Sequence, residues 1–206
     1  MKSIAKILVV ALSGLALSGC VSVKMGSPQP SLQTLEALRA SDFPAMAVGS
    51  FTLAPGLPAS LDRSASIRAV SLSSPEDGSF AKYLGKVLET DLRLSGKLDP
   101  NADTVLSGLL TASSVDSESD KGRATLGAKF SLLRAGKRVF EKTLKVDATW
   151  DSTFIGAVAI PDAINNYTAL YDKLALSLLT DADFKAAVMP AKPAEVPPAP
   201  SGTPAR

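Results

Sequence analysis

Polar and apolar residues alternate most regularly in the middle of the chain. From 124 to 132 every second residue is apolar, and a run from 140 to 150 repeats the alternation except at Lys142. A period of two is typical of strands that bury one face. Between these runs, Gly136 lies in a polar segment and can adopt the positive φ of a tight turn. The pattern therefore predicts a long antiparallel hairpin.

Three further apolar segments have the composition of strands. Residues 104–115 lead into a polar turn at 116–122, so this segment should pair with the first strand of the hairpin. Two shorter runs, 45–53 and 67–73, are rich in Val, Ile and Phe. We expect about five strands in one mostly antiparallel sheet.

Apolar spacings of three and four residues predict two helices. The first stripe consists of Phe80, Tyr83, Leu84, Val87, Leu88 and Asp91. Ser79 can cap its start, and Gly96 ends it. The second stripe begins after Pro161 and consists of Ile164, Tyr167, Leu170, Tyr171, Leu174, Ala175 and Leu178.

Asp181 is expected to cap a short final turn through Phe184 and Val188. The order of elements is then strand, strand, helix, three strands, helix. This order predicts an α/β two-layer sandwich, with a mostly antiparallel sheet of about five strands and two helices on one face.

The N-terminus has the pattern of a secretory signal. Lys2 and Lys6 flank the start of the apolar run 7–17, which is shorter than the roughly 20 residues that a helix needs to cross a bilayer. The run ends in Leu17-Ser18-Gly19-Cys20, which resembles the lipobox of bacterial lipoprotein signals. The alternative is an ordinary secretory signal followed by an incidental cysteine.

The lipobox resemblance implies a lipid anchor on Cys20. It implies diacylglycerol on the sulfur, cleavage that removes residues 1–19, and acylation, for example with palmitate, of the new amino group. Val21 is not the aspartate that typically retains such proteins in the inner membrane. We therefore expect a protein that is attached to the periplasmic face of the outer membrane.

Composition divides the remaining chain into three parts. Residues 20–40 are expected to be the lipidated cysteine and a tether, and residues 41–189 the α/β domain. Residues 190–206 contain six prolines, which predicts a disordered tail. The tail is either simply a solvated end, which is favoured, or it acts as a spacer or as a ligand for a partner's groove.

Charge and missing residue types exclude several functions. Without Lys2 and Lys6, the 22 basic residues fall to 20 and equal the 20 acidic ones, so the mature chain is neutral and no nucleic-acid partner is expected. The chain has no histidine and one cysteine, which excludes Ser-His-Asp and Cys-His catalysis. We expect no enzyme activity, cofactor or metal.

Two short motifs have simple structural interpretations. Ser79-Phe80-Ala81-Lys82 matches the S-x-x-K pattern of serine acyl-enzymes, but Ser79 is better explained as a helix cap. Asp116, Glu118 and Asp120 suggest a calcium loop. The EF-hand pattern fails at its glycine and glutamate positions, so a charged hairpin turn is favoured.

The segment 150–161 is strongly apolar although it connects a strand to a helix. Such connections are normally polar and exposed. Either residues 154–160 form an exposed patch for lipid, membrane or a partner protein, or they fold back over the open end of the sheet and close the core. Its candidate contact residues are Trp150, Phe154, Ile155 and Ile160.

The order of elements over about residues 45–185, with Val105-Leu106-Ser107-Gly108 in a strand, resembles small envelope lipoproteins. In particular it is similar to YajG-type lipoproteins and to the auxiliary lipoproteins of ABC-type lipid transporters. The resemblance implies a non-enzymatic adaptor or accessory subunit in envelope assembly or lipid transport, with an envelope or transporter protein as partner. The alternatives are a lipid-binding carrier and, least favoured, a hydrolase that uses Ser79 and Lys82.

Overall fold

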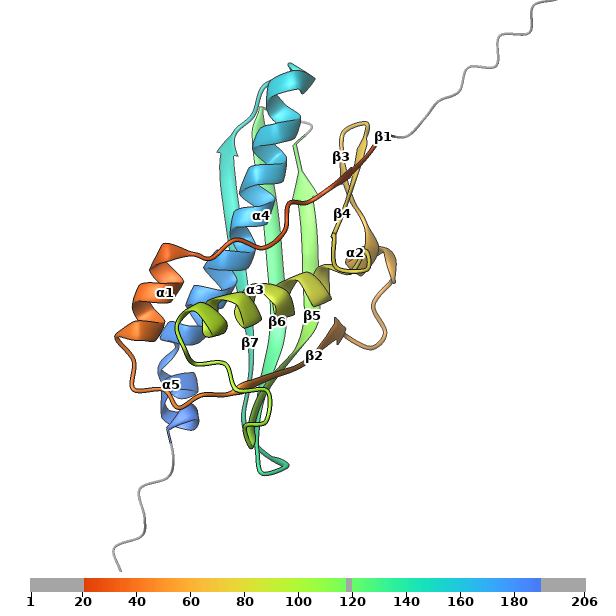
Figure 1. Cartoon of the computed structure of the whole chain (residues 1–206). Helices are drawn as coiled ribbons and strands as arrows, with labels where there is room; N and C mark the ends of the chain where they lie inside the picture. The colour runs from red at the N-terminus through yellow and green to blue at the C-terminus, as the bar shows by residue number, and fades with distance from the viewer. Residues whose placement is uncertain (1–20, 118–119, 190–206) are drawn as a thin grey trace, which may run out of the picture.

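The computed structural model describes residues 21–117 and 120–189 (Figure 1). The strands are β1 (Val21–Lys24), β2 (Ala47–Leu53), β3 (Ala65–Ile67), β4 (Val70–Ser73), β5 (Thr104–Asp116), β6 (Lys121–Arg134) and β7 (Lys137–Asp151). The helices are α1 (Leu32–Arg39), α2 (Ser60–Arg63), α3 (Phe80–Leu94), α4 (Gly156–Thr180) and α5 (Ala182–Val188). The strands form a four-stranded sheet in the order β2-β5-β6-β7 and a three-stranded sheet in the order β1-β4-β3.

The predicted hairpin is confirmed. Strands β6 and β7 pair antiparallel along almost their whole length, with Leu126 opposite Val146, and β5 pairs antiparallel with β6 as expected. The turn residues Ala135 and Gly136 have φ values of 47° and 75°. Two positive values suit the right-handed twist of the flanking strands. Alternation and turn chemistry thus set the register of this sheet.

The predicted fold class is wrong in two respects, although the protein is a mixed α/β structure. The strands lie in two sheets rather than in one sheet of about five strands, and the described residues hold five helices rather than two. The segment predicted as one strand over 67–73 reverses at Arg68, whose φ is 54°, so that β3 and β4 form a hairpin of their own. A run of apolar residues indicates a strand but not its partner or a reversal within it.

The segment predicted as a tether over residues 20–40 contains β1 and α1. Strand β1 pairs parallel with β4, and Met25 is buried after it. The Tyr83 hydroxyl donates to the Gly26 carbonyl at 3.1 Å, and the Ser31 amide donates to Asp91 Oδ1 at 3.2 Å. The chain therefore packs against the domain from Val21 onward.

Helices α3 and α4 cover one face of the four-stranded sheet (Figure 1). Ser79 caps α3 as predicted, since its hydroxyl accepts from the Lys82 amide. Close approach of α3 depends on two glycines, because a Cβ at Gly85 or Gly108 would lie 2.8 or 2.4 Å from the Phe51 ring. Between sheet and helices, buried side chains fill the core: Phe80, Tyr83, Leu84, Leu106, Phe130, Tyr167, Tyr171 and Leu174.

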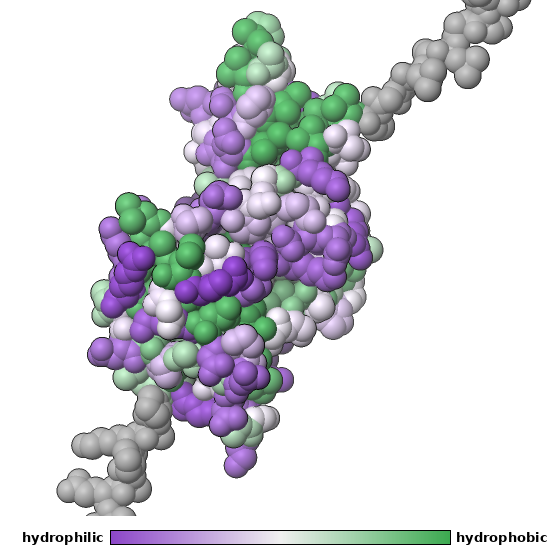
Figure 2. All heavy atoms as spheres, viewed as in Figure 1, coloured by the Kyte–Doolittle hydropathy of each residue, from purple (hydrophilic) through white to green (hydrophobic). Residues whose placement is uncertain are grey.

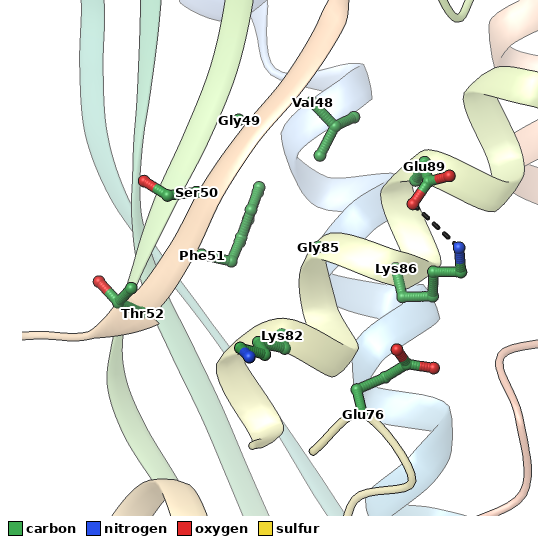
Figure 3. Close-up of a pocket in the computed structure, with 10 residues that line it drawn as sticks. All are labelled: Val48, Gly49, Ser50, Phe51, Thr52, Glu76, Lys82, Gly85, Lys86 and Glu89. Carbon is green, nitrogen blue, oxygen red and sulfur yellow. Dashed lines mark hydrogen bonds and ion pairs between the residues drawn. The ribbon is translucent and has the colours of Figure 1, made fainter. Parts of the chain in front are cut away.

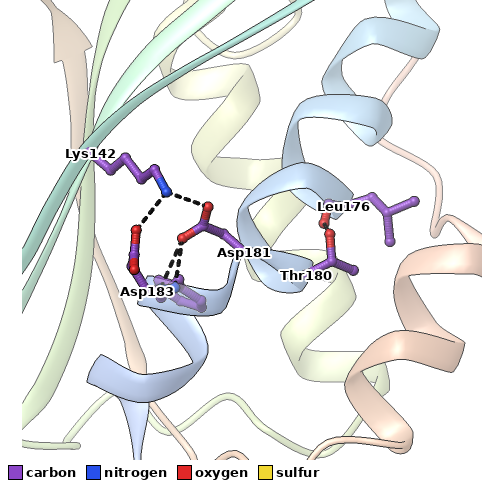
Figure 4. Close-up of polar contacts among 6 residues, drawn as sticks. Lys142, Leu176, Thr180, Asp181 and Asp183 are labelled. Carbon is purple, nitrogen blue, oxygen red and sulfur yellow. Dashed lines mark hydrogen bonds and ion pairs between the residues drawn. The ribbon is translucent and has the colours of Figure 1, made fainter.

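Lys142, the one polar residue on the inward face of β7, has a structural explanation (Figure 4). Its ammonium group lies 2.7 Å from a carboxylate oxygen of Asp181 and 2.7 Å from one of Asp183. Asp181 caps α5, as predicted, by accepting from the backbone of Asp183 and Phe184. Lys142 therefore joins the last helix to the sheet.

The predicted start of the second long helix is wrong. Helix α4 begins at Gly156, so residues 156–160 form its first turns rather than a connection, and Pro161 lies inside it. Proline has no N–H, so the bond from residue 161 to the carbonyl of Ala157 cannot form. The sequence rule that proline opens a helix fails because these first turns pack by Ala159 and Ile160 against the domain.

Candidate functional site

The upper end of the molecule in Figure 1 combines three segments that are distant in sequence. We call this end the apex and define it by Val21 at the start of β1, Arg68 in the β3–β4 turn, and Phe154, Ile155 and Val158 at the start of α4. Val21 pairs with Val70, which lies two residues after Arg68. The small sheet thus brings the beginning of the described chain to the tip of α4.

Arg68 connects the β3–β4 turn to the segment before α4. Its guanidinium donates to the carbonyl of Phe154 at 2.8 Å and also to that of Thr153. It donates twice to the Ser117 carbonyl at the end of β5, at 3.0 and 3.1 Å. Charged donors make stronger hydrogen bonds than neutral ones. Arg68 therefore holds the segment in place with the Phe154 side chain outside.

Large apolar side chains are exposed at the apex. Phe154 is 91% exposed, and the values for Val21, Ile155 and Val158 are 57%, 51% and 49%. Figure 2 shows hydrophobic residues over the tip of α4 and over the neighbouring surface beside β1. Single exposed apolar residues are ordinary, but a group of them marks an interaction surface.

Two predicted contact residues lie inward of this surface. Ile160 is half-buried and packs against the core, as does Trp150. The Trp150 ring lies across Gly122 of β6, where a Cβ would be only 2.1 Å from it. The indole N–H finds no acceptor among residues 21–117 and 120–189. Phe154 and Ile155 therefore form the exposed part of the predicted patch, while Trp150 and Ile160 support it.

The side chains of Ser79 and Lys82 are bound to other partners and do not pair with each other. The Ser79 hydroxyl donates to Asp62 Oδ1 at 3.0 Å and accepts from the Lys82 amide at 3.1 Å. The Lys82 ammonium lies 2.7 Å from a carboxylate oxygen of Asp77. A serine nucleophile needs a base that accepts its proton. In this arrangement the serine is a helix cap and the lysine is one partner of a surface ion pair.

Only part of the acidic segment 116–120 lies within the described residues. Asp116 ends β5 and Asp120 precedes β6, while Glu118 lies outside the described residues. Within the described ranges, no group of three metal-ligating side chains comes together. The segment therefore provides no argument for a calcium site.

A groove of about 400 Å³ lies between the edge strand β2 and α3 (Figure 3). Its rim carries Lys82, Lys86 and Glu89, and Phe51 contributes apolar surface. Lys86 pairs with Glu89 at 3.1 Å, and Glu89 also pairs with Arg93. Glu76 also lines the groove, so its two lysines are balanced by two glutamates and it has no concentrated charge for an ionic ligand.

Two acids lie where α3 and α4 meet residues 26–31: Asp91, which is fully buried, and Asp172, which is half-buried. The pKa of Asp91 is raised to about 6, mainly by burial and also by the nearby carboxylate of Asp172, while the hydrogen bond from the Ser31 amide lowers it. Burial also raises the pKa of Asp172 to about 6. Asp91 Oδ2 has no hydrogen-bond partner in the described part of the chain. These acids make the free energy of unfolding depend on pH.

Several predicted features lie outside the described residues. They are the signal peptide 1–19, Cys20 and the tail 190–206. Among the helices that are described, none combines the length and apolar character required to cross a bilayer. The membrane anchor therefore stays a prediction from the Cys20 motif.

Sequence reasoning missed two apex residues, Val21 and Arg68, and included Val158 only as part of the apolar segment. Val158 lies within the apolar segment 150–161, but its exposure on the first turn of a helix follows only once α4 is known to begin at Gly156. The hydrogen bonds of Arg68 reach 49 to 86 residues along the chain. No local pattern predicts such contacts.

Comparison with known proteins gives only distant likenesses. No family model matches the chain, and no curated protein matches it. A Xanthomonas campestris protein of the DUF330 family is similar in structure, with a TM-score of 0.46 and 15% identity over 77% of this chain and 91% of that one.

Two further structures carry lipoprotein names. A lipoprotein candidate from Caulobacter crescentus has a TM-score of 0.41 and 17% identity over 52% of this chain and 81% of that one. A minor lipoprotein of Acinetobacter baumannii has a TM-score of 0.39 and 12% identity over 68% of this chain and 92% of that one. Likeness at this level assigns no function.

Proposed function

We propose that this protein is a bacterial envelope lipoprotein that is anchored through Cys20 and acts without catalysis as an adaptor or accessory subunit in envelope assembly or lipid transport. The observation that carries the proposal is Leu17-Ser18-Gly19-Cys20, placed after Lys2, Lys6 and a short apolar run. Two or more acyl chains give stable membrane attachment where one is marginal.

We assign the anchor to the periplasmic face of the outer membrane because Val21 follows the cysteine. The accessory role rests on the resemblance in element order and on the site geometry. The Ser79 hydroxyl is a helix cap, and the described chain offers an exposed apolar apex in place of convergent catalytic groups. An apolar exposed surface suits contact with a membrane or a partner protein.

The lipid-carrier alternative is less favoured. It requires an apolar cavity between the sheet and the helices. That space is filled by side chains such as Phe130, Tyr167 and Leu174, each at most 1% exposed. We therefore keep the adaptor role as the proposed function.

Lipidation is tested by growing cells with labelled palmitate and separating their inner and outer membranes. We expect label on the protein in the outer-membrane fraction, and none on Cys20→Ala. The matched control combines Cys20→Ala with Ser22→Cys, which keeps one thiol but moves it two residues from the motif. Label on this control, or absence of label from the native chain, would contradict a lipobox at Cys20.

The accessory role is tested by cross-linking in the same cells. We expect one reproducible transporter or assembly protein to be recovered with the native chain from the outer-membrane fraction. Recovery of phospholipid alone from the native chain would instead support the carrier.

A further inference from the structure

The chain leaves the domain at the apex with no spacer before Cys20. Strand β1 starts at Val21, and its pairing with β4 runs from Val21 opposite Val70 to Lys24 opposite Ser73. The Met25 amide continues this pairing by donating to the Ser73 carbonyl at 2.9 Å. Adjacent α-carbons are about 3.8 Å apart. A lipid on Cys20 would therefore hold the start of β1 at the membrane surface.

The apolar residues of α4 lie at this same end. Val21 pairs with Val70, the β3–β4 turn carries Arg68, and Arg68 donates to the carbonyl of Phe154 at 2.8 Å. These contacts connect the start of β1 to the exposed segment before α4 through the β3–β4 turn. Phe154, Ile155 and Val158 consequently lie at the same end of the domain as the start of β1.

From this arrangement we propose that the apex is a membrane-inserting surface, in which Phe154, Ile155 and Val158 enter the boundary between head groups and acyl chains of the leaflet that holds the Cys20 lipid. The inference rests on the proposed anchor at Cys20. Apolar faces of surface-bound segments are buried at this depth, which keeps the neighbouring backbone in the polar layer. The domain then stands on the bilayer at two points, with α5 at the end that faces away (Figure 1).

Charge favours lipid acyl chains over an anionic surface as the occupant. Arg68 donates to three carbonyls. Lys121, the first residue of β6, pairs with Asp151, the last residue of β7. These cations already have anionic or carbonyl partners, while large apolar side chains are exposed at the apex. Insertion should therefore occur into neutral phosphatidylcholine and should persist at high salt.

The test couples Cys20 chemically to the bilayer, so that it does not depend on lipidation in cells. The chain from Cys20 to Arg206 has a single thiol, which reacts with maleimide-phosphatidylethanolamine in phosphatidylcholine vesicles. Phe154→Trp is the reporter, and brominated phosphatidylcholine is the quencher. The matched control is Leu32→Trp on α1, where the native leucine is 67% exposed. The native Trp150 signal of the parent chain is subtracted from both.

We expect a blue shift and loss of most of the emission from Phe154→Trp, and neither change in Leu32→Trp. Equal quenching of the two reporters, or no quenching of Phe154→Trp, would overturn membrane insertion. A photo-crosslinker at position 154 that forms one discrete protein adduct in cells would assign the apex to a protein partner instead. Failure of palmitate labelling would refute the natural anchor while leaving this measurement valid.

Discussion

At the scale of single residues, the buried carboxylate of Asp91 makes the stability of the fold depend on pH. It is fully buried on α3, and the Ser31 amide donates to one of its oxygens. Its pKa is raised from 3.8 to about 6, mainly by burial and also by the carboxylate of Asp172. The folded protein therefore holds this proton more tightly than the unfolded chain does. The contribution of Asp91 to stability is full below about pH 4 and is lost as the pH rises through 6.

Asp91→Asn should consequently stabilise the protein above pH 6. The amide keeps an oxygen for the Ser31 N–H and removes the buried charge, and we expect a gain of about 1 kcal/mol in the free energy of unfolding at pH 8. The gain should disappear near pH 4, where the native carboxyl is neutral. Urea unfolding at both pH values measures it, with Asp42→Asn as an exposed control. A gain of equal size at both pH values would refute the charge argument.

At the scale of elements, the structure depends on side chains that join elements distant in sequence. Lys142 joins β7 to α5, and Arg68 joins the β3–β4 turn to the segment before α4. Arg68 has a positive φ, which glycine adopts more readily. Its place in this turn is explained by the hydrogen bonds of its guanidinium rather than by the backbone.

Arg68→Ala should therefore loosen the apex more than the rest of the molecule. Loss of these hydrogen bonds is expected to cost about 1–2 kcal/mol and to speed amide exchange over residues 153–160. Hydrogen-exchange mass spectrometry on the native chain and the variant gives the comparison. Arg63→Ala is the matched control, because Arg63 donates a single hydrogen bond to the exposed Asp77 carbonyl. Similar exchange in both variants would show that Arg68 does not hold the segment.

At the scale of the whole molecule, residues 21–31 are packed on the domain and fix the direction in which the chain leaves it. They pair with β4, bury Met25 and pass over α3, where Tyr83 and Asp91 bind them. A flexible tether would let the domain tumble away from the membrane. If Cys20 carries the proposed lipid, a packed segment instead fixes the angle between this anchor and the domain.

A chain that begins at Leu32 should therefore be less stable than one that begins at Cys20. It loses the β1–β4 pairing, the buried Met25 and two long-range hydrogen bonds, and we expect a loss of about 3 kcal/mol or more. Thermal unfolding followed by circular dichroism measures the difference. Removal of residues 190–206, the predicted solvated tail, is the control and should change little. Equal melting temperatures for the two starting points would show that residues 21–31 are a tether after all.

The sequence by itself determined the local features of this protein. Alternation at 124–132 and 140–150 predicted the hairpin, the spacing from Phe80 to Asp91 predicted α3, and both Ser79 and Asp181 were identified as caps. These features follow from interactions within a few residues, where pattern and propensity act directly. The Cys20 motif is likewise local, and it stays the basis for the proposed anchor.

Only the tertiary structure decided how these elements are assembled. It placed β1 and α1 where a tether was expected, divided 67–73 at Arg68, and started α4 before Pro161. It also separated the exposed Phe154 and Ile155 from the inward Trp150 and Ile160. Each outcome depends on partners many residues away, such as the carbonyls that Arg68 reaches. Burial and strand pairing are properties of such long-range contacts, and a single sequence does not state which contacts form.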